Sequence, residues 1–170
     1  MSKVFAALLI LGLTSNACFA GEAEDQANSF ANIYASLCLK NLSNLDALRE
    51  KLKLVPKLPP EKAAMFLSGL PGDAWPVPDK YGTFVLAIPS GKNLCAVHGR
   101  RASTEVAKKL FTQIVAIAPS PLIAKQVQSE QAQTTANGQT ETVSYEWGVP
   151  DATRKMLFTL TTASSDTAQL

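Results

Sequence analysis

The sequence predicts an α+β domain in which N-terminal helices pack on an antiparallel sheet of about five strands. Apolar residues recur at helical spacing in the first part of the chain and again after Ser103. Residues 83–98 and 123–162 contain short β-branched or alternating segments separated by Gly, Pro and Asn. Strands joined by such short turns pair antiparallel, and the order of the elements fits a profilin-like or PAS-like topology. This likeness concerns architecture and carries no function.

The first two helices are predicted from apolar spacing and a capping signal. A polar lead over residues 21–26 precedes a helix that runs to about residue 40. Its apolar stripe consists of Phe30, Ile33, Tyr34, Leu37 and Cys38. Ser43, with Asp46 three residues later, resembles a capping box for a second helix, which ends before Pro56.

A third, short helix and a loop follow. Pro60 suits the first turn of a helix, and Gly69 is placed to end it. Residues 70–80 are rich in turn formers and are predicted as a loop. Within it, we expect Trp75 to fill the edge of the core rather than to stack on a ligand.

The central segment predicts a hairpin and a fourth helix. Residues 83–88 and 94–98 form two short apolar strands on either side of a turn. Ser103 or Thr104 caps the helix that follows, and Pro119 lies beyond its end. The apolar stripe of this helix consists of Val106, Leu110, Ile114, Val115 and Ile117.

The C-terminal segment predicts three further strands. Residues 123–133 and 141–147 alternate in polarity on either side of an Asn137-Gly138 turn, which is typical of a hairpin. Residues 155–162 form the last strand. Its apolar face carries Met156, Phe158 and Leu160.

The first twenty residues have the composition of a secretory signal peptide. Lys3 supplies a positive start, residues 4–13 form an apolar run too short to cross a bilayer, and residues 14–20 are small or polar. Cleavage after Ala20 would release a soluble periplasmic protein. Cleavage before Cys18 would leave that cysteine for lipid attachment and anchor the protein in the outer membrane. Membrane attachment is therefore expected through a lipid or not at all.

After the predicted signal over residues 1–20, we expect one α+β domain over residues 21–162 and a loose tail over residues 163–170. The chain of 170 residues is 46% hydrophobic, with its long apolar run at the N-terminus. This composition excludes a multi-pass membrane protein and an intrinsically disordered chain.

Cys38 and Cys95 remain after cleavage at Ala20 and are the natural disulfide pair in an oxidising compartment. The bond would join the first helix to the sheet. The alternative is two buried, reduced thiols. A catalytic pair of Cys95 with His98 is disfavoured, because side chains three residues apart on a strand point to opposite faces.

Charge is uneven along the chain. Residues 40–109 hold 12 basic and 6 acidic side chains, although the formal net charge of the chain is only +2. Lys51, Lys53, Arg100 and Arg101 are candidate contacts for an anionic group or an acidic partner; the alternative is an ordinary solvated face. Nucleic acid is disfavoured as a partner, because basic and aromatic residues do not alternate.

Few residues suit catalysis. His98 is the one histidine, and neither a Gly-x-Ser-x-Gly motif nor a phosphate-binding loop accompanies it. The acidic residues are scattered, although a carboxylate pair would be formed by the fold rather than by sequence spacing. No metal or cofactor is expected.

Several segments together resemble a family of small exported bacterial proteins of unassigned activity. They are the signal peptide, Phe30 with Cys38, Ala64-x-Phe66-Leu67-x-Gly69, Gly72-x-Ala74-Trp75, Val85-Leu86-Ala87 and Asn93-x-Cys95-x-Val97. The resemblance covers roughly residues 25–100. It implies bacterial export and paired cysteines, and it transfers no catalytic residue.

These observations favour a non-enzymatic protein that binds another component of the bacterial envelope or of a secretion assembly. The alternatives are a small periplasmic enzyme using His98 or an acidic pair, and an inhibitor of an envelope enzyme.

Overall fold

The computed structural model describes residues 16–135 and 137–164. The elements are α1 Asn16–Ile33, α2 Leu45–Leu52, α3 Pro60–Ala63, β1 Gly72–Asp79, β2 Gly82–Pro89, β3 Ala96–His98, α4 Thr104–Val115, β4 Ile123–Thr134, β5 Gly138–Gly148 and β6 Met156–Ala163. The end of α1 continues as a π-helical turn, Tyr34–Cys38, and a 3₁₀ turn, Leu39–Asn41. The α+β class is confirmed.

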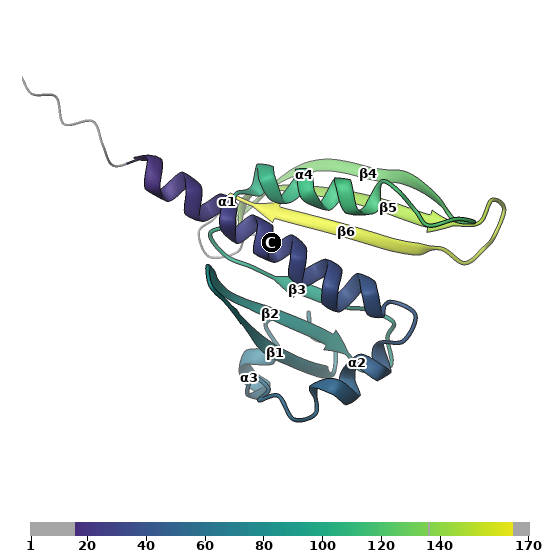
Figure 1. Cartoon of the computed structure of the whole chain (residues 1–170), viewed down its shortest axis with the longest axis horizontal. Coiled ribbons are helices and arrows are strands. Elements are labelled where there is room, and N and C mark those ends of the chain that lie inside the picture. Colours follow the sequence, from purple (N-terminus) through teal and green to yellow (C-terminus); the bar gives the residue numbers. More distant parts are fainter. Residues whose placement is uncertain (1–15, 136, 165–170) are drawn as a thin grey trace, which may run out of the picture.

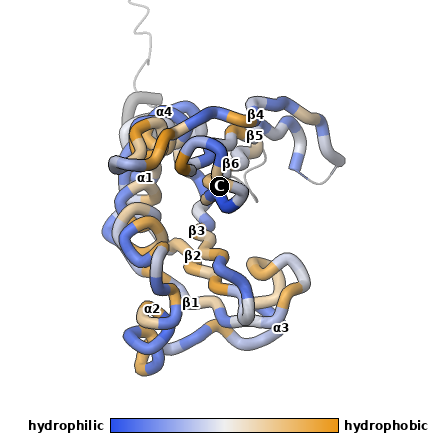
Figure 2. Tube along the Cα trace, turned by 90° about the vertical axis from the view of Figure 1, so that its right-hand side faces the viewer, coloured by the Kyte–Doolittle hydropathy of each residue, from blue (hydrophilic) through white to orange (hydrophobic). Residues whose placement is uncertain are grey.

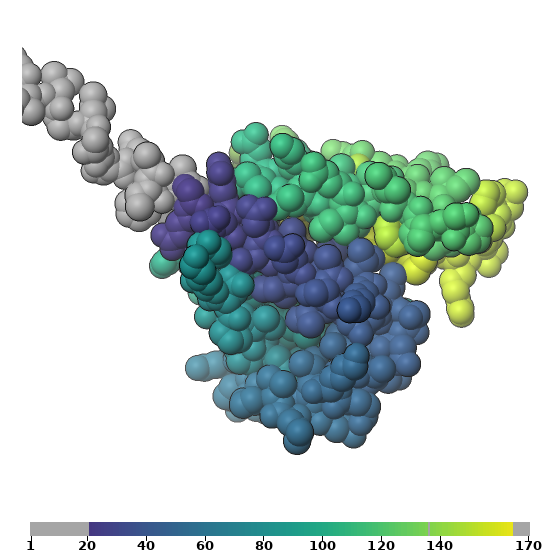
Figure 3. Space-filling model, in the orientation of Figure 1, coloured from purple at the N-terminus to yellow at the C-terminus, as the bar shows by residue number. Residues whose placement is uncertain are grey.

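The prediction of one sheet of about five strands is wrong, because the strands form two antiparallel sheets. We call β1-β2-β3 sheet A and β4-β5-β6 sheet B. The two sheets lie one above the other, with β3 and β6 as the neighbouring edges (Figures 1 and 2). Helix α1 packs against both α4 and β3 and crosses between the sheets (Figure 3). A profilin-like or PAS-like single sheet is therefore absent from the described residues.

Strand β1 lies where a loop was predicted. This strand contains Pro76 and Pro78, although proline cannot donate to a ladder and is disfavoured inside a sheet. However, β1 is an edge strand, and the carbonyl of Ala74 accepts from the amide of Leu58, so the backbone groups of Ala74 face away from β2. Residues two apart share this direction. Both prolines therefore occupy positions that contribute no hydrogen bond to β2.

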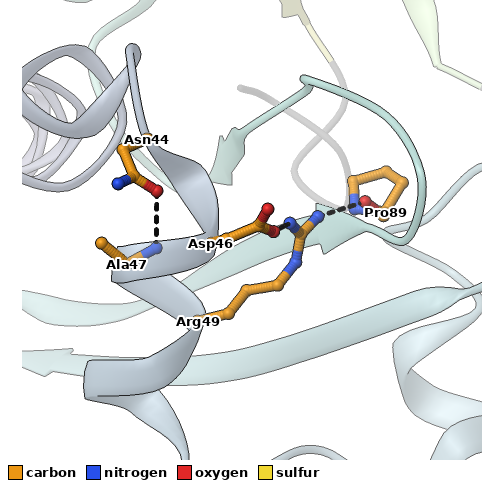
Figure 4. Close-up of polar contacts among 5 residues, drawn as sticks. All are labelled: Asn44, Asp46, Ala47, Arg49 and Pro89. Atoms are coloured by element: carbon orange, nitrogen blue, oxygen red, sulfur yellow. Dashed lines mark hydrogen bonds and ion pairs between the residues drawn. The ribbon is translucent and has the colours of Figure 1, made fainter.

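The cap of α2 also differs from the prediction. The side chain of Asn44, rather than that of Ser43, accepts a hydrogen bond from the amide of Ala47, at 2.9 Å (Figure 4). Arg49 then pairs with Asp46 and donates to the carbonyl of Pro89, which ties α2 to the end of β2 (Figure 4).

Helices α3 and α4 begin as predicted, but α3 ends well before Gly69, and Val115 is the one residue of the predicted α4 stripe that is fully buried. Pro60 begins α3, which ends at Ala63. Ser103 caps α4, its hydroxyl accepting from the amide of Val106. The buried residues of α4 are Ala107, Phe111 and Val115, whereas the predicted stripe residue Ile117 lies beyond the helix and is 78% exposed.

The long C-terminal hairpin is confirmed, with Gly138 at a positive φ of 68° following its turn. One face of sheet B, including Phe158 and Leu160, packs on α4 and belongs to the main hydrophobic core. The last strand ends at Ala163, one residue later than predicted, and the amide of Ser164 donates to the carbonyl of Gln139.

Most of the predicted signal peptide and most of the predicted tail lie outside the described residues. The parts that lie outside are residues 1–15 and residues 165–170. Position 18 belongs to α1, and lipidation of Cys18 stays a prediction.

Cys38 and Cys95 form a disulfide, with their Cα atoms 5.5 Å apart. The bond joins the end of α1 to the residue that precedes β3. A disulfide of this kind is typical of proteins that fold in an oxidising compartment outside the cytoplasm. Trp75, 1% exposed, is a core residue as predicted.

Candidate functional site

A cleft of about 1650 Å³ opens between sheet A and sheet B. Its two sides are residues 93–100, which contain β3, and residues 154–161, which contain most of β6. Every residue of these two runs lines the cleft. Because successive side chains of a strand point to opposite faces, an unbroken run means that the edge of each strand, rather than one face, borders the cleft.

Aromatic side chains from the helical layer form the back of the cleft. They are Phe30 and Tyr34 of the first helix and Phe111 of α4. The rings of Tyr34 and Phe111 lie 6.0 Å apart between centroids. Burial raises the pKa of the Tyr34 hydroxyl to about 12, so this group is neutral at physiological pH.

His98 and the segment around α3 form the lower side. The His98 ring lies 5.2 Å from the ring of Phe66, between centroids, and its Nε2 is buried without a hydrogen-bond partner in the described chain. Burial lowers the pKa of His98, although a hydrogen bond with the Phe66 backbone partly opposes this shift. The imidazole is therefore neutral at pH 7.

The charged side chains that line the cleft in the described residues are all basic. They are Lys62, Arg100, Arg154 and Lys155. Lys155 is paired with Glu146, at 3.2 Å, on the exposed side of sheet B. Arg100 and Arg154 lie on opposite sides of the cleft, since one follows β3 and the other precedes β6. The cleft thus combines an apolar interior with positive charge around it.

The structure does not bring the predicted basic residues together. Lys51 lies on α2 and Lys53 directly follows that helix, which Arg49 ties to the Pro89 carbonyl at one end of sheet A. Lys53 is paired with Glu50 at 2.6 Å. Arg100 and Arg101 follow β3 toward the opposite end of that sheet. Among these four residues, only Arg100 lines the cleft. Their role in contacting an anionic partner stays a prediction.

The described residues offer few side chains for nucleophilic catalysis or metal binding. Cys95 is held in the disulfide and is not a free thiol beside His98. Within residues 16–135 and 137–164, no group of three or more His, Cys, Asp or Glu side chains is placed to hold a metal ion.

Sequence reasoning missed most of the cleft. No sequence pattern indicated the open edge of β6 or its flanking residues, Arg154 and Lys155. Whether a strand has an unpaired edge depends on its neighbours in the sheet and not on its own sequence. Helical spacing accounts for Phe30, Tyr34 and Phe66 as helix residues and indicates no binding role for them. The uniform sign of the cleft charges was likewise invisible, since Arg100 and Arg154 are 54 positions apart in the sequence.

Comparisons of the chain with models of protein families, with curated proteins and with solved structures found no match. In the part of the chain that the structure describes, no helix is both long and apolar enough to span a bilayer.

Proposed function

We propose that this protein is a non-enzymatic binding component of the bacterial envelope, and that it holds a partner protein in the cleft between its two sheets. The observation that carries the proposal is the apolar cleft with its uniformly basic charged residues. The fold and the disulfide supply a rigid frame for such a site.

The size of the cleft favours a protein segment over a small metabolite. Clefts that hold small molecules measure about 300–1,000 Å³. The cleft here, at about 1650 Å³, exceeds that range. It is also bordered by strand edges along its length, which offers many backbone contacts and few specific polar side chains.

The residues around His98 favour binding over catalysis. A general base needs a group that orients it and a reacting group within reach. The described residues that line the cleft include no carboxylate to orient His98 and no free thiol to act as a nucleophile. The enzyme alternative is tested by His98→Gln, since loss of a general base costs about 10²- to 10⁴-fold in rate. We expect binding by this variant to stay within a few fold of wild type.

The periplasm is the compartment that suits this function. The Cys38–Cys95 bond is typical of proteins in an oxidising compartment, and the N-terminal sequence has the pattern of an export signal. A protein exported in this way would meet envelope proteins, and its basic cleft would attract an acidic segment of one of them. An inhibitor of an envelope enzyme would use the same site and differs only in the consequence of binding.

Site-specific photocrosslinking in the native envelope tests the proposal. A photoreactive phenylalanine analogue replaces Leu157, which lines the cleft and is 64% exposed. The matched control replaces Leu54, which is 96% exposed and lies outside the cleft. We expect a discrete protein adduct from position 157 and not from position 54. Equal adducts from both positions, or none from position 157, would contradict the proposal.

A further inference from the structure

Strand β6 presents unused backbone groups to the cleft. The amide of Ser164 donates to the carbonyl of Gln139, so the backbone groups of Ser164 face β5. In an antiparallel ladder, the side to which the backbone N–H and C=O groups point alternates from one residue to the next. Counting back along the register, the N–H and C=O groups of Leu157, Thr159 and Thr161 face away from β5, toward the cleft.

Strand β3 does the same from the other side. The backbone N–H and C=O groups of Ala74 point away from β2, so those of Ala87, its partner in the register, point away from β1. They point toward β3, where Ala87 pairs with Ala96. The next residue, Val97, therefore directs its backbone groups away from β2, into the cleft. Within the described chain, these outward groups of β3 and β6 make no backbone hydrogen bond.

The two open edges are also matched in direction. Strand β3 is antiparallel to β2, and Figure 1 shows the arrowhead of β6 opposite in direction to that of β2. Strands β3 and β6 thus run the same way, and a strand antiparallel to one is antiparallel to both. Antiparallel pairing is slightly more stable per residue than parallel pairing.

We propose that the cleft accepts one extended segment of a partner protein, which pairs with β3 and β6 together and joins sheets A and B into one sheet. This inference rests on the proposed binding function and specifies its mode as strand addition. The inserted strand would supply partners for the backbone groups of Val97 on one side and of Leu157, Thr159 and Thr161 on the other.

The volume of the cleft is large enough for such a strand. Eight extended residues, the length of β6, span about 27 Å, and a strand about 4.8 Å wide and 10 Å deep fills about 1300 Å³ over that length. The cleft volume of about 1650 Å³ accommodates this segment with its side chains.

The lining of the cleft specifies the chemistry of the segment. Alternate side chains of the inserted strand would point to the aromatic back wall of Phe30, Tyr34 and Phe111, and these are expected to be apolar. Arg100 and Arg154 flank the two strand edges, so acidic residues are expected toward the ends of the segment.

Selection of displayed peptides on the intact, oxidised protein tests this mode. The probe is a phage-displayed library of random ten-residue peptides. We expect enrichment of peptides with apolar residues at alternate positions and acidic residues near the ends. Synthetic copies of the enriched peptides are then measured by fluorescence anisotropy, and methylation of single backbone nitrogens in their centre should weaken binding about tenfold or more.

A matched pair of protein variants tests the contribution of one outward amide of β6. Thr159→Pro removes an outward amide without breaking the β5 ladder, and Thr159→Val keeps that amide while losing the same hydroxyl. We expect the proline variant to bind the selected peptides about tenfold or more weakly than the valine variant. The peptide methylation series gives an independent result if the proline variant folds poorly.

Each other outcome overturns strand addition. Such outcomes are selected peptides that tolerate methylation and bind both variants equally, failure to enrich any peptide, displacement of the peptides by dodecanoate as an apolar ligand of the cleft, and self-association through the cleft in sedimentation. A crosslink from position 157 combined with any of these outcomes would leave the proposed binding function standing and reject only its mode.

Discussion

Trp147 and Trp75 are both buried, and their indole nitrogens have different surroundings. The Nε1 group of Trp147 donates to the carbonyl of Val115, at 2.6 Å, at the end of α4. Carbonyls at a helix end have no partner inside the helix, so Trp147 satisfies one of them. The Nε1 group of Trp75 has no partner in the described chain.

Trp147→Phe should therefore destabilise the protein more than Trp75→Phe. Both changes remove similar volume, and only the first leaves a buried carbonyl unpaired, at a cost of about 1–3 kcal/mol. Urea unfolding of the two variants gives the comparison. Equal losses would mean that the Trp147 hydrogen bond contributes nothing to the free energy of unfolding.

Burial of neutral His98 makes stability depend on pH. The folded-state pKa lies below the ordinary value of 6.5, so the unfolded chain binds a proton more readily. The free energy of unfolding should fall as pH drops through about 6.5 toward the folded pKa, by up to about 1.4 kcal/mol per pH unit. His98→Gln should flatten this dependence. Denaturation between pH 7.5 and 5 measures it, and parallel curves for both proteins would refute it.

The residue that caps α2 in the structure differs from the residue predicted by the capping box. Asn44 accepts from the amide of Ala47, whereas no cap hydrogen bond of Ser43 is present in the described chain. Asn44→Ala should cost about 1 kcal/mol of stability, and Ser43→Ala should cost close to nothing. Thermal unfolding of both variants tests the position of the cap, and the reverse order would restore the predicted box.

The helices and strands could be predicted where local chemistry decides them. Proline and glycine signals gave the start of α3 and the turn before β5, and Ser103 gave the cap of α4. Strand β1 was missed because its prolines are tolerated only through the direction of their backbone positions, which depends on pairing with β2. The division into two sheets was missed for a related reason, since it depends on tertiary packing, in which α1 contacts both α4 and β3.

The Cys38–Cys95 bond closes a loop with a sequence separation of 57 residues. In the chain-entropy model, such a loop stabilises the fold by about 4 kcal/mol. Cys38→Ala with Cys95→Ala should lower the free energy of unfolding by this order, as measured in urea. Reductant should have the same effect on wild type and none on the double variant. Equal stability of both proteins would contradict the prediction.

The charges around the cleft should act mainly on the rate of association. Arg100→Glu should slow binding of the crosslinked partner at low salt, and the difference from wild type should shrink as salt rises, because exposed charges are screened over about 8 Å at physiological ionic strength. Lys51→Glu is the control, since Lys51 lies away from the cleft. Stopped-flow association at several salt concentrations tests this. Identical behaviour of the two variants would remove Arg100 from the approach surface.

The prolines of β1 have a consequence for self-assembly. Sheet A has two edges, and a chain that approaches along β1 meets Pro76 and Pro78, which have no N–H to offer. The opposite edge, along β3, lies recessed beside β6 and the helices rather than on the outer surface. Sheet A can therefore keep one edge receptive to a guest strand while copies of the protein are prevented from stacking edge to edge into fibres through β1.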